Sequence, residues 1–384
     1  LLEHLHVHPM IAEAIPFIFK YYERDWGLCC SRELRDSLED DRYRVVIRTS
    51  SSYGTLKVGE VVAPGASDET IVLCAHLCHP AMVNDDLSGV VVGMDVMREL
   101  FARRDLHYTY RYIIVPETIG SLAWLSANEE LIPKMRGGLF LEMLGRDYPH
   151  ALQHSFDGDT DVDRAFAKAL KEADPRAWTA RFRELAGNDE RQFNAPGVRV
   201  PMLSLTRVVK TAEPNAYYRE YHSSHDTPEL VPPGCLEESR GVVVRMVEEV
   251  ERKREAGSRK QELPRVQGSG FRVQERPSKA SSPHSRPSST LPSPSSPRKR
   301  GSMAAIDGRT IPINRYPGEP FCSRFGVNID AYANPEGYRA LFDILYLVDG
   351  TRSIEQIAKE CAVGVDSVVG TMEELRRRGV VDVA

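Results

Sequence analysis

The sequence predicts an α/β fold built on a mixed, mostly parallel sheet with helices on both faces. Short apolar runs rich in β-branched residues alternate with helical patterns from the start of the chain to about residue 250. The candidate strands are apolar almost throughout, which is typical of strands covered by helices on both sides. Polar side chains follow directly after several of these strands, where α/β sheets bind their ligands.

Each expected element follows from its local pattern of apolar residues. Strands are expected where short apolar runs are bounded by turn residues, at 44–48, 56–62, 70–75, 110–115, 138–142 and 201–205. Helices are expected where apolar residues recur at helical spacing, at 88–104, 121–130, 162–173 and 236–254. The alternation of the two kinds indicates βαβ units.

Composition excludes several classes of protein. The chain has 384 residues and a net charge of −5, which gives no overall attraction to nucleic acid or to an anionic membrane. No apolar run approaches the ~20 residues of a membrane span, and no signal peptide is recognised. The seven cysteines show neither zinc-finger spacing nor a disulfide framework. We therefore expect a cytoplasmic protein that does not bind membranes.

Composition also divides the chain into regions. The α/β domain is expected over residues 66–251. Residues 252–310 contain mostly Ser, Pro, Arg and Lys and few large apolar side chains. Such a segment cannot bury enough apolar surface to offset its conformational entropy, so we predict a disordered basic linker.

The last region, 320–384, is predicted to be a winged helix-turn-helix domain. Its pattern indicates helices at 336–348, 354–361 and 365–378, followed by a short β tail. The third of these helices begins with Val365, Asp366 and Ser367, which offer none of the side chains that usually read bases. Glu373 and Glu374 oppose phosphate. We therefore expect packing or protein contact here rather than DNA binding.

Side chains that can bind a metal follow the predicted strands at four places. In chain order they are His76, His79, Asp85, Glu117, Glu142, His222 and Asp226. A carboxylate at the end of a buried strand is costly unless it is paired or metal-bound. Imidazoles and carboxylates together suit zinc. One glutamate would remain as a general base that deprotonates water.

The order His–Asp–Glu–Glu–His, carried by CHPAMVNDDLSG, YRYIIVPETIGS and EYHSSHDTPELV, resembles zinc aminopeptidases of the bacterial leucyl aminopeptidase and aminopeptidase Y type. A closer resemblance, which includes AIPFIFKYYERDWGLC and YRVVIRT, is to an aminopeptidase-like family of unknown function. That family carries an inserted small β domain and ends in a winged helix. The resemblance implies a zinc-exopeptidase-like fold. It also implies that residues 1–65 are a remnant of the inserted β domain with its lead-in, since the N-terminal part of the family pattern is missing.

The resemblance also implies roles for individual residues. His76 and Glu142 would hold one zinc ion and His222 a second, with Asp85 bridging them. Glu117 falls on the position of the general base. Two further acids are implied on the substrate side, namely Asp189 and Asp226.

Two positions depart from the zinc aminopeptidase pattern. Cys78 stands where an aspartate orients the ligand histidine, and Thr118 stands where a second glutamate binds the second metal. The loss of a carboxylate weakens the second site, so one zinc ion or two are both compatible with the sequence. His79 could compensate, and the choice between His76 and His79 as the ligand stays open.

Three functions follow from these residues. The first is a zinc-dependent exopeptidase of the aminopeptidase type, which acts on a peptide or small amide with Glu117 as general base. The second is an amide deacylase that acts on a sugar or another small molecule with the same chemistry. The third is a non-catalytic, ligand-sensing protein with the winged helix as its regulatory module. The sequence leaves the oligomeric state open, a homo-oligomer included.

Overall fold

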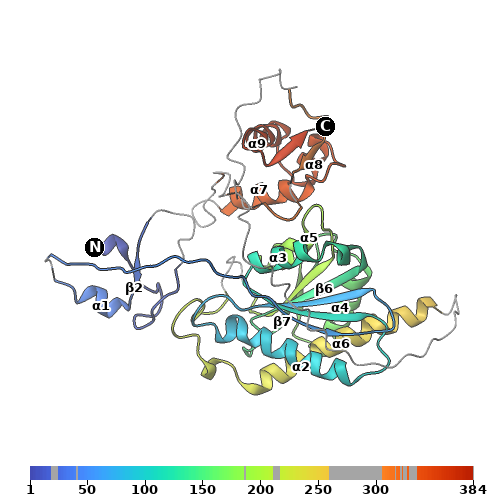
Figure 1. The fold of residues 1–384 in the computed structure, drawn as a ribbon, viewed down its shortest axis with the longest axis horizontal. Helices are drawn as coiled ribbons and strands as arrows, with labels where there is room; N and C mark the ends of the chain where they lie inside the picture. Colours follow the sequence, from blue (N-terminus) through green and yellow to red (C-terminus); the bar gives the residue numbers. More distant parts are fainter. Residues whose placement is uncertain are drawn as a thin grey trace, which may run out of the picture.

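The computed structural model describes residues 1–18, 25–39, 42–185, 187–210, 217–258, 305–315, 317–320, 322, 327 and 335–383. Within these residues the main domain contains a seven-stranded sheet in the order β3-β5-β4-β6-β9-β7-β8 (Figure 1). The strands are β3 (Gly59–Ala63), β4 (Thr70–His76), β5 (Thr109–Val115), β6 (Met135–Glu142), β7 (His150–Gln153), β8 (Trp178–Ala180) and β9 (Met202–Arg207).

The sheet is mixed and mostly parallel, as predicted. The central strands β5, β4, β6 and β9 run parallel to one another, and β7 runs parallel to β8. The pairs β3–β5 and β7–β9 are antiparallel. The carboxyl ends of the four central strands therefore meet at one edge.

Helices cover both faces of the sheet. The helices α2 (Ser88–Ala102), α4 (Asp161–Ala173) and α6 (Pro233–Ser258) pack on one face, and α3 (Ile119–Ala127) and α5 (Glu190–Asn194) lie on the other. Side chains of β4 alternate between the two cores, as a strand requires. Ile71 and Leu73 join the α2–α4–α6 side, while Val72 and Cys74 join the α3–α5 side.

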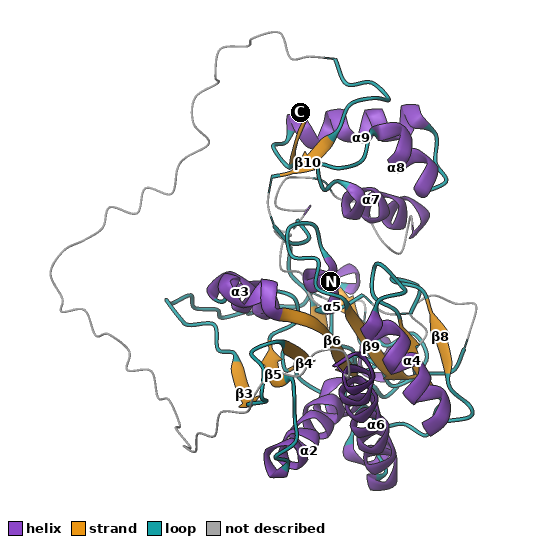
Figure 2. Cartoon of the chain, turned by 90° about the vertical axis from the view of Figure 1, so that its right-hand side faces the viewer, coloured by secondary structure: helices purple, strands orange, loops and turns teal. Residues whose placement is uncertain are grey.

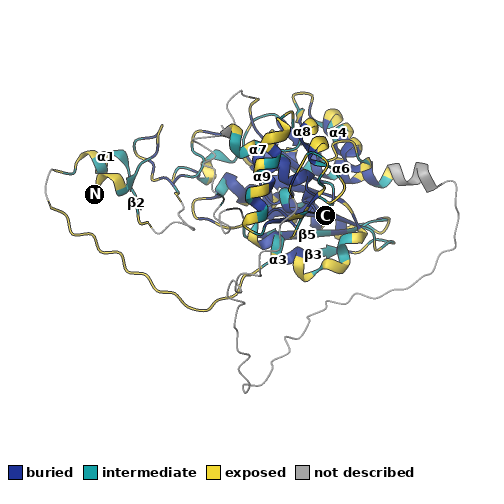
Figure 3. Ribbon diagram, turned by 90° about the horizontal axis from the view of Figure 1, so that it is seen from above, coloured by how far each residue is buried: buried dark blue, intermediate teal, exposed yellow. Residues whose placement is uncertain are grey.

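Three expectations for the α/β region need revision. The strand predicted at 44–48 is wrong, because residues 42–58 form no strand and are almost all exposed (Figure 3). A β-rich pattern forms a strand only when a neighbour completes its hydrogen bonds, and the described residues provide none here. The short strands β7 and β8 and the helix α5 were not predicted. The remaining strands and helices begin and end within a few residues of the expected positions. The second strand begins at Gly59 rather than at residue 56, and the helix expected at 121–130 ends at Ala127, before a short 3-10 helix (Glu129–Lys134).

The N-terminal residues form a small unit of their own. It contains a 3-10 helix (Leu2–His4), the parallel pair β1 (Leu5–His6) and β2 (Leu28–Cys29), and α1 (Arg32–Asp36). Residues 14–17 lie between the two strands of this unit in the sequence and contact the main domain, where Pro16 forms an antiparallel bridge with Ser223.

A second, smaller core lies in the C-terminal residues (Figure 2). Its elements are β10 (Pro312–Asn314), α7 (Pro335–Leu347), α8 (Ile354–Glu360), α9 (Val365–Arg377) and β11 (Val381–Val383), with β10 antiparallel to β11. The winged helix-turn-helix assignment and the domain boundaries stay predictions. Most of the predicted linker, 259–304, lies outside the described residues. Among the residues that are described, we find no helix with the length and apolarity that crossing a bilayer demands.

Candidate metal centre

Three of the predicted site residues lie at the carboxyl edge of the sheet because three neighbouring parallel strands end there. His76 is the last residue of β4, and Glu142 is the last residue of β6. Glu117 follows β5 by two residues. The register pairs His76 with Val115, so the ends of β4 and β5 are level. This edge is where ligands bind in α/β sheets.

The loop between β4 and α2 brings Asp85 to the same place. Its turn (Val83–Leu87) is fixed by Asp86, whose buried carboxylate accepts hydrogen bonds from the backbone N–H groups of His76, Gly89 and Met143 at 3.2, 3.1 and 3.0 Å. Asp86 thereby ties together β4, α2 and the end of β6.

Asp226 supports the same turn from the other side. It was expected on the substrate side, but its carboxylate is buried and accepts the backbone N–H groups of Asn84 and Asp85 at 3.0 and 3.2 Å. The hydroxyl of Tyr218 also donates to it, at 3.0 Å. In this arrangement Asp226 positions Asp85.

Asp85 stands at the centre of a cluster of imidazoles. Its Oδ1 lies 3.0 Å from Nε2 of His76. Its Oδ2 lies 3.2 Å from Nε2 of His79 and 3.1 Å from Nε2 of His222. The sequence left the choice between His76 and His79 open. The structure brings both to Asp85, on different oxygens.

Glu142 completes one side of this cluster. Its carboxylate is 3% exposed, and its Oε1 accepts a hydrogen bond of 2.7 Å from Nδ2 of Asn188. Its Oε2 is buried and has no hydrogen-bond partner among the described residues. Buried polar atoms are seldom left this way, so this oxygen points to a missing partner.

The described residues hold three groups of possible ligand atoms, and two of these groups share Asp85. The third contains His76, Cys78 and Glu117. Of the two that share Asp85, His76, Asp85 and Glu142 make one, and His79, Asp85 and His222 make the other, with the atoms of each group within 4.8 Å of one another. We call these two the strand-end group and the loop group. Each offers nitrogen and oxygen donors in the number that zinc takes from protein in catalytic sites. The residues present therefore fit one or two zinc ions.

The electrostatics of the cluster agree with this fit. Burial acts to raise the pKa of Asp85, but hydrogen bonds from His222, His76 and His79 hold it well below its usual range. Burial, followed by the nearby charge of Asp85, raises the pKa of Glu142 well above its usual range. A divalent cation would relieve the cost of keeping both carboxylates charged.

Glu117 lies beside the strand-end group and is partly exposed. Its carboxylate falls within 4.8 Å of the ligand atoms of His76 and Cys78. The next residue, Thr118, has a φ of +56°, an uncommon conformation for a residue with a side chain. It is therefore held by neighbouring contacts.

Asp189 supplies these contacts. It was expected on the substrate side, but it has no exposed surface. Its Oδ1 accepts a 2.8 Å hydrogen bond from the backbone N–H of Thr118, and it also accepts the hydroxyl of Ser121. Burial raises the pKa of Asp189 to about 7. Asp189 thus holds the turn that carries Glu117.

Cys78 takes the place where the resemblance expects a carboxylate. Its Sγ lies 3.2 Å from Nδ1 of His76. This contact orients the ring so that Nε2 faces Asp85, which is the usual task of a group that contacts a metal ligand from behind.

Two features of the site were missed from the sequence. Phe17 donates its backbone N–H to the carbonyl of His222 at 2.7 Å, and its ring centre lies 4.9 Å from that of His79 and 5.7 Å from that of His222. Asn188, which contacts Glu142, was also missed. Both contacts join residues that are far apart in the sequence, so no local pattern announces them.

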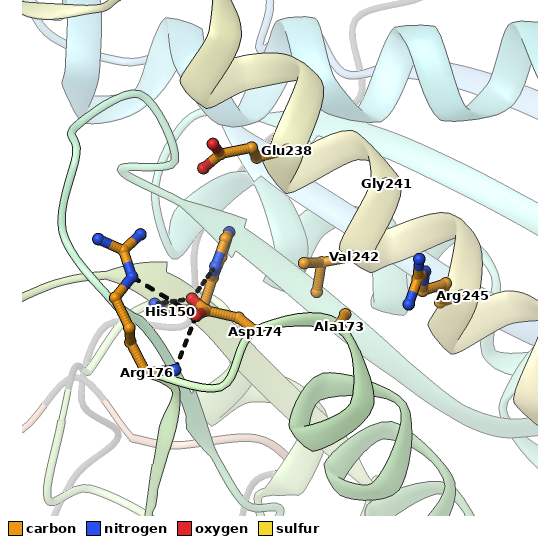
Figure 4. Close-up of a pocket in the computed structure, with 8 residues that line it drawn as sticks. All are labelled: His150, Ala173, Asp174, Arg176, Glu238, Gly241, Val242 and Arg245. Carbon is orange, nitrogen blue, oxygen red and sulfur yellow. Dashed lines mark hydrogen bonds and ion pairs between the residues drawn. The ribbon is translucent and has the colours of Figure 1, made fainter.

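A separate polar cavity of about 400 Å³ lies between α4 and α6, lined by His150, Asp174, Glu238 and Arg245 among others (Figure 4). His150 contacts Asp174 through Nδ1 at 2.8 Å and Ser239 through Nε2 at 3.0 Å. This order matches a Ser–His–Asp triad. Ser239 is fully buried, however, so its hydroxyl cannot reach a substrate. The three residues join β7, the end of α4 and α6 through hydrogen bonds.

The fold and the cluster together define an α/β protein with a candidate metal centre at the carboxyl edge of its mostly parallel sheet. Residues 23–253 match the model of a family described as a domain of unknown function, DUF4910. The chain belongs to this family.

Comparison with individual proteins agrees with this fold. A Clostridium acetobutylicum protein, provisionally named a polysaccharide biosynthesis protein with an aminopeptidase-like domain, is 35% identical over 224 residues, which cover 58% of this chain and 50% of the relative. The chain thus spans about half the length of this curated relative.

One solved structure shares the fold of this chain. A crystal structure from Clostridium acetobutylicum, provisionally assigned as a peptidase, superposes with a TM-score of 0.59 and 24% identity over 100% of this chain and 73% of that one. A zinc aminopeptidase from Bacillus subtilis has a TM-score of 0.42 and 17% identity over 50% and 48% of the two chains. This second likeness is too low to bear on the fold or on the function.

Proposed function

We propose that this chain is a zinc-dependent hydrolase that acts as an aminopeptidase-like exopeptidase, with Glu117 as general base. The observation that carries the proposal is the pair of ligand groups that share Asp85, with the partly exposed Glu117 beside them. The relative with an aminopeptidase-like domain supports the same class of reaction.

In the proposal, His76 and Glu142 would hold one zinc ion, His79 and His222 would hold the second, and Asp85 would contribute to both sites. His79 takes the place of the carboxylate that Thr118 cannot supply. Bound zinc supplies Lewis acidity toward the amide carbonyl and lowers the pKa of water. With one carboxylate replaced by a neutral imidazole, the loop group carries less negative charge than the strand-end group.

The protein's own residues carry the proton. Glu117 accepts a proton from the attacking water as the water oxygen bonds to the carbonyl carbon. It then passes that proton to the amide nitrogen as the C–N bond breaks, so that an amine leaves with a carboxylic acid, which gives its remaining proton to the solvent. Asp189 holds the turn on which Glu117 sits, and its fully buried side chain keeps that turn in place.

A second candidate is hydrolysis of an acyl amide on a sugar. The chemistry is the same, and only the group that the pocket accepts differs. The name of the Clostridium acetobutylicum relative pairs polysaccharide biosynthesis with an aminopeptidase-like domain, which favours this substrate class.

The test is hydrolysis by the zinc-loaded chain of two panels, aminoacyl anilides and N-acetylated sugars, with the Glu117→Gln variant beside it. We expect one panel to be cleaved and kcat to fall at least ~100-fold in the variant with zinc content unchanged, because a general base is worth roughly 10²- to 10⁴-fold. The matched control is Glu129→Gln, which changes an exposed carboxylate after α3. Activity retained in Glu117→Gln would remove the assigned base, and bound zinc without cleavage of either panel would contradict the proposal.

A further inference from the structure

We use the term C-terminal domain for the elements from β10 to β11 together with the segment 317–320 before α7. Its contact with α5 has no part in the proposed reaction, yet α5 is connected to the metal centre through hydrogen bonds. In Figures 1 and 2, α7 lies on the side of the C-terminal domain that faces α5. The helix α5 follows directly after Asn188 and Asp189. These two residues contact Glu142 and Thr118.

The contact is centred on Arg191, in the first turn of α5. Its Nη1 lies 3.2 Å from Oε1 of Glu319, and the two side chains are only 14% and 8% exposed. The hydroxyl of Tyr346, on α7, lies 2.8 Å from the carbonyl oxygen of Arg191 and 2.9 Å from Oε2 of Glu319. Arg191 is therefore held at both its guanidinium and its backbone.

Backbone contacts reinforce the same place. The N–H of Glu319 donates to Oε1 of Gln192 at 3.2 Å, and the N–H of Gly318 donates to the carbonyl of Pro196 at 3.0 Å. The segment 317–320 thus lies along α5 from its first turn to its end.

From α5 the contacts lead directly to the site. The side chain of Asn188 donates to Oε1 of Glu142 at 2.7 Å, and its backbone N–H donates to Glu190 at 2.9 Å. Asp189 accepts the backbone N–H of Thr118 at 2.8 Å. The helix α5 has five residues, and a helix this short does not fix its own position. Its placement depends on the groups around it.

We propose that Glu319 and Tyr346 are positioning residues for the metal centre. By holding Arg191 they keep α5 and the preceding loop in the place from which Asn188 orients Glu142 and Asp189 orients the turn of Glu117. The C-terminal domain is then part of the active site's support. This inference rests on the proposed metal-dependent function.

The physical reason is the burial of the ion pair. A buried guanidinium that loses its carboxylate partner leaves an uncompensated charge, which drives the side chain and its helix toward water. Displacement of Asn188 would remove the group that orients a metal ligand. The loss of such a group typically lowers metal affinity by roughly 10- to 100-fold.

The chain offers a matched control for simple docking of the two domains. Arg183 contacts Asp343 of α7 at 2.8 Å, also between the main and C-terminal domains. Arg183 lies outside α5 and outside the loop that contacts Glu142. The variant Asp343→Asn therefore weakens docking without releasing Arg191.

The experiment measures zinc affinity of the full chain by competition with a chromophoric chelator, and the visible absorption of the cobalt-substituted protein. The variants are Glu319→Gln, Tyr346→Phe and Asp343→Asn, each checked by circular dichroism. We expect Glu319→Gln and Tyr346→Phe to weaken the tighter zinc binding by roughly 10-fold and to shift the cobalt bands, since both act through a group that orients a ligand. Asp343→Asn should stay within about 2-fold of the unmodified protein.

Equal affinities and spectra for Glu319→Gln, Tyr346→Phe and the unmodified chain would overturn the inference, as would an equal loss in Asp343→Asn. If Glu319→Gln fails to fold, Tyr346→Phe decides, because it removes one hydroxyl and keeps the ring that packs on Phe156. An unmodified chain that binds no zinc would instead overturn the proposed function, and this inference with it. The two failures are therefore distinguishable.

Discussion

The two ligand groups that share Asp85 are built from different parts of the fold. In the strand-end group, His76 and Glu142 terminate adjacent parallel strands and are 1% and 3% exposed. In the loop group, His79 and His222 lie on two loops, and the side chain of His222 is 24% exposed. The sheet fixes the first group, and contacts between loops fix the second.

The strand-end group is therefore the more rigid part of the centre. The register between β4 and β6 sets the spacing of His76 and Glu142 through backbone hydrogen bonds. The loop group depends on Asp86, Asp226 and the ring of Phe17. We therefore expect tighter binding of zinc at the strand-end group and weaker binding at the loop group.

The largest effect is expected from Asp85→Ala, because Asp85 belongs to both groups. The substitution should lower zinc affinity at both by more than about 100-fold, since groups that merely orient a ligand are worth roughly 10- to 100-fold. Zinc content after dialysis measures this. Asp95→Ala, which changes a carboxylate of α2 away from the centre, is the control. An Asp85→Ala protein that keeps its zinc would contradict the role of Asp85 as a ligand in both groups.

The next effect is expected from Glu142→Gln, which removes one charged ligand and keeps the volume of the side chain. The tighter step of a zinc titration should be lost, and the weaker step should remain, because the loop group does not contain Glu142. Isothermal titration calorimetry separates the two steps. Loss of the weaker step alone would show that the strand-end group, and not the loop group, is the weaker zinc site.

The smallest effect is expected from Phe17→Ala. The ring packs on His79 and His222 at centroid distances of 4.9 and 5.7 Å. Aromatic contacts of this kind contribute about 0.5–1.5 kcal/mol, which is roughly 2- to 10-fold in affinity. The weaker titration step should shift by that amount while the tighter step stays in place. An unchanged titration would show that Phe17 does not order the loop group.

The strand-end residues could be predicted from the sequence because a buried strand is an apolar run, and the first polar residue after it falls at the edge of the sheet. His76, Glu117 and Glu142 all follow this rule. The parallel fold class followed from the same runs. These signals are local, and the sequence carries them in full.

The remaining features depend on contacts that no local pattern contains. His76 and His79 follow the same strand three residues apart, and only the path of the loop shows that both face Asp85. Asn188 and Phe17 reach the site from distant segments. The expected strand at 44–48 failed for the related reason that a strand is completed only by its neighbour.

The most direct test of the central claim is the number of zinc ions per chain, measured by mass spectrometry on the unmodified protein and on His79→Ala. We expect two ions in the unmodified chain and one in the variant, since His79 belongs only to the loop group. Two ions in both proteins, or none in the unmodified chain after zinc loading, would contradict it.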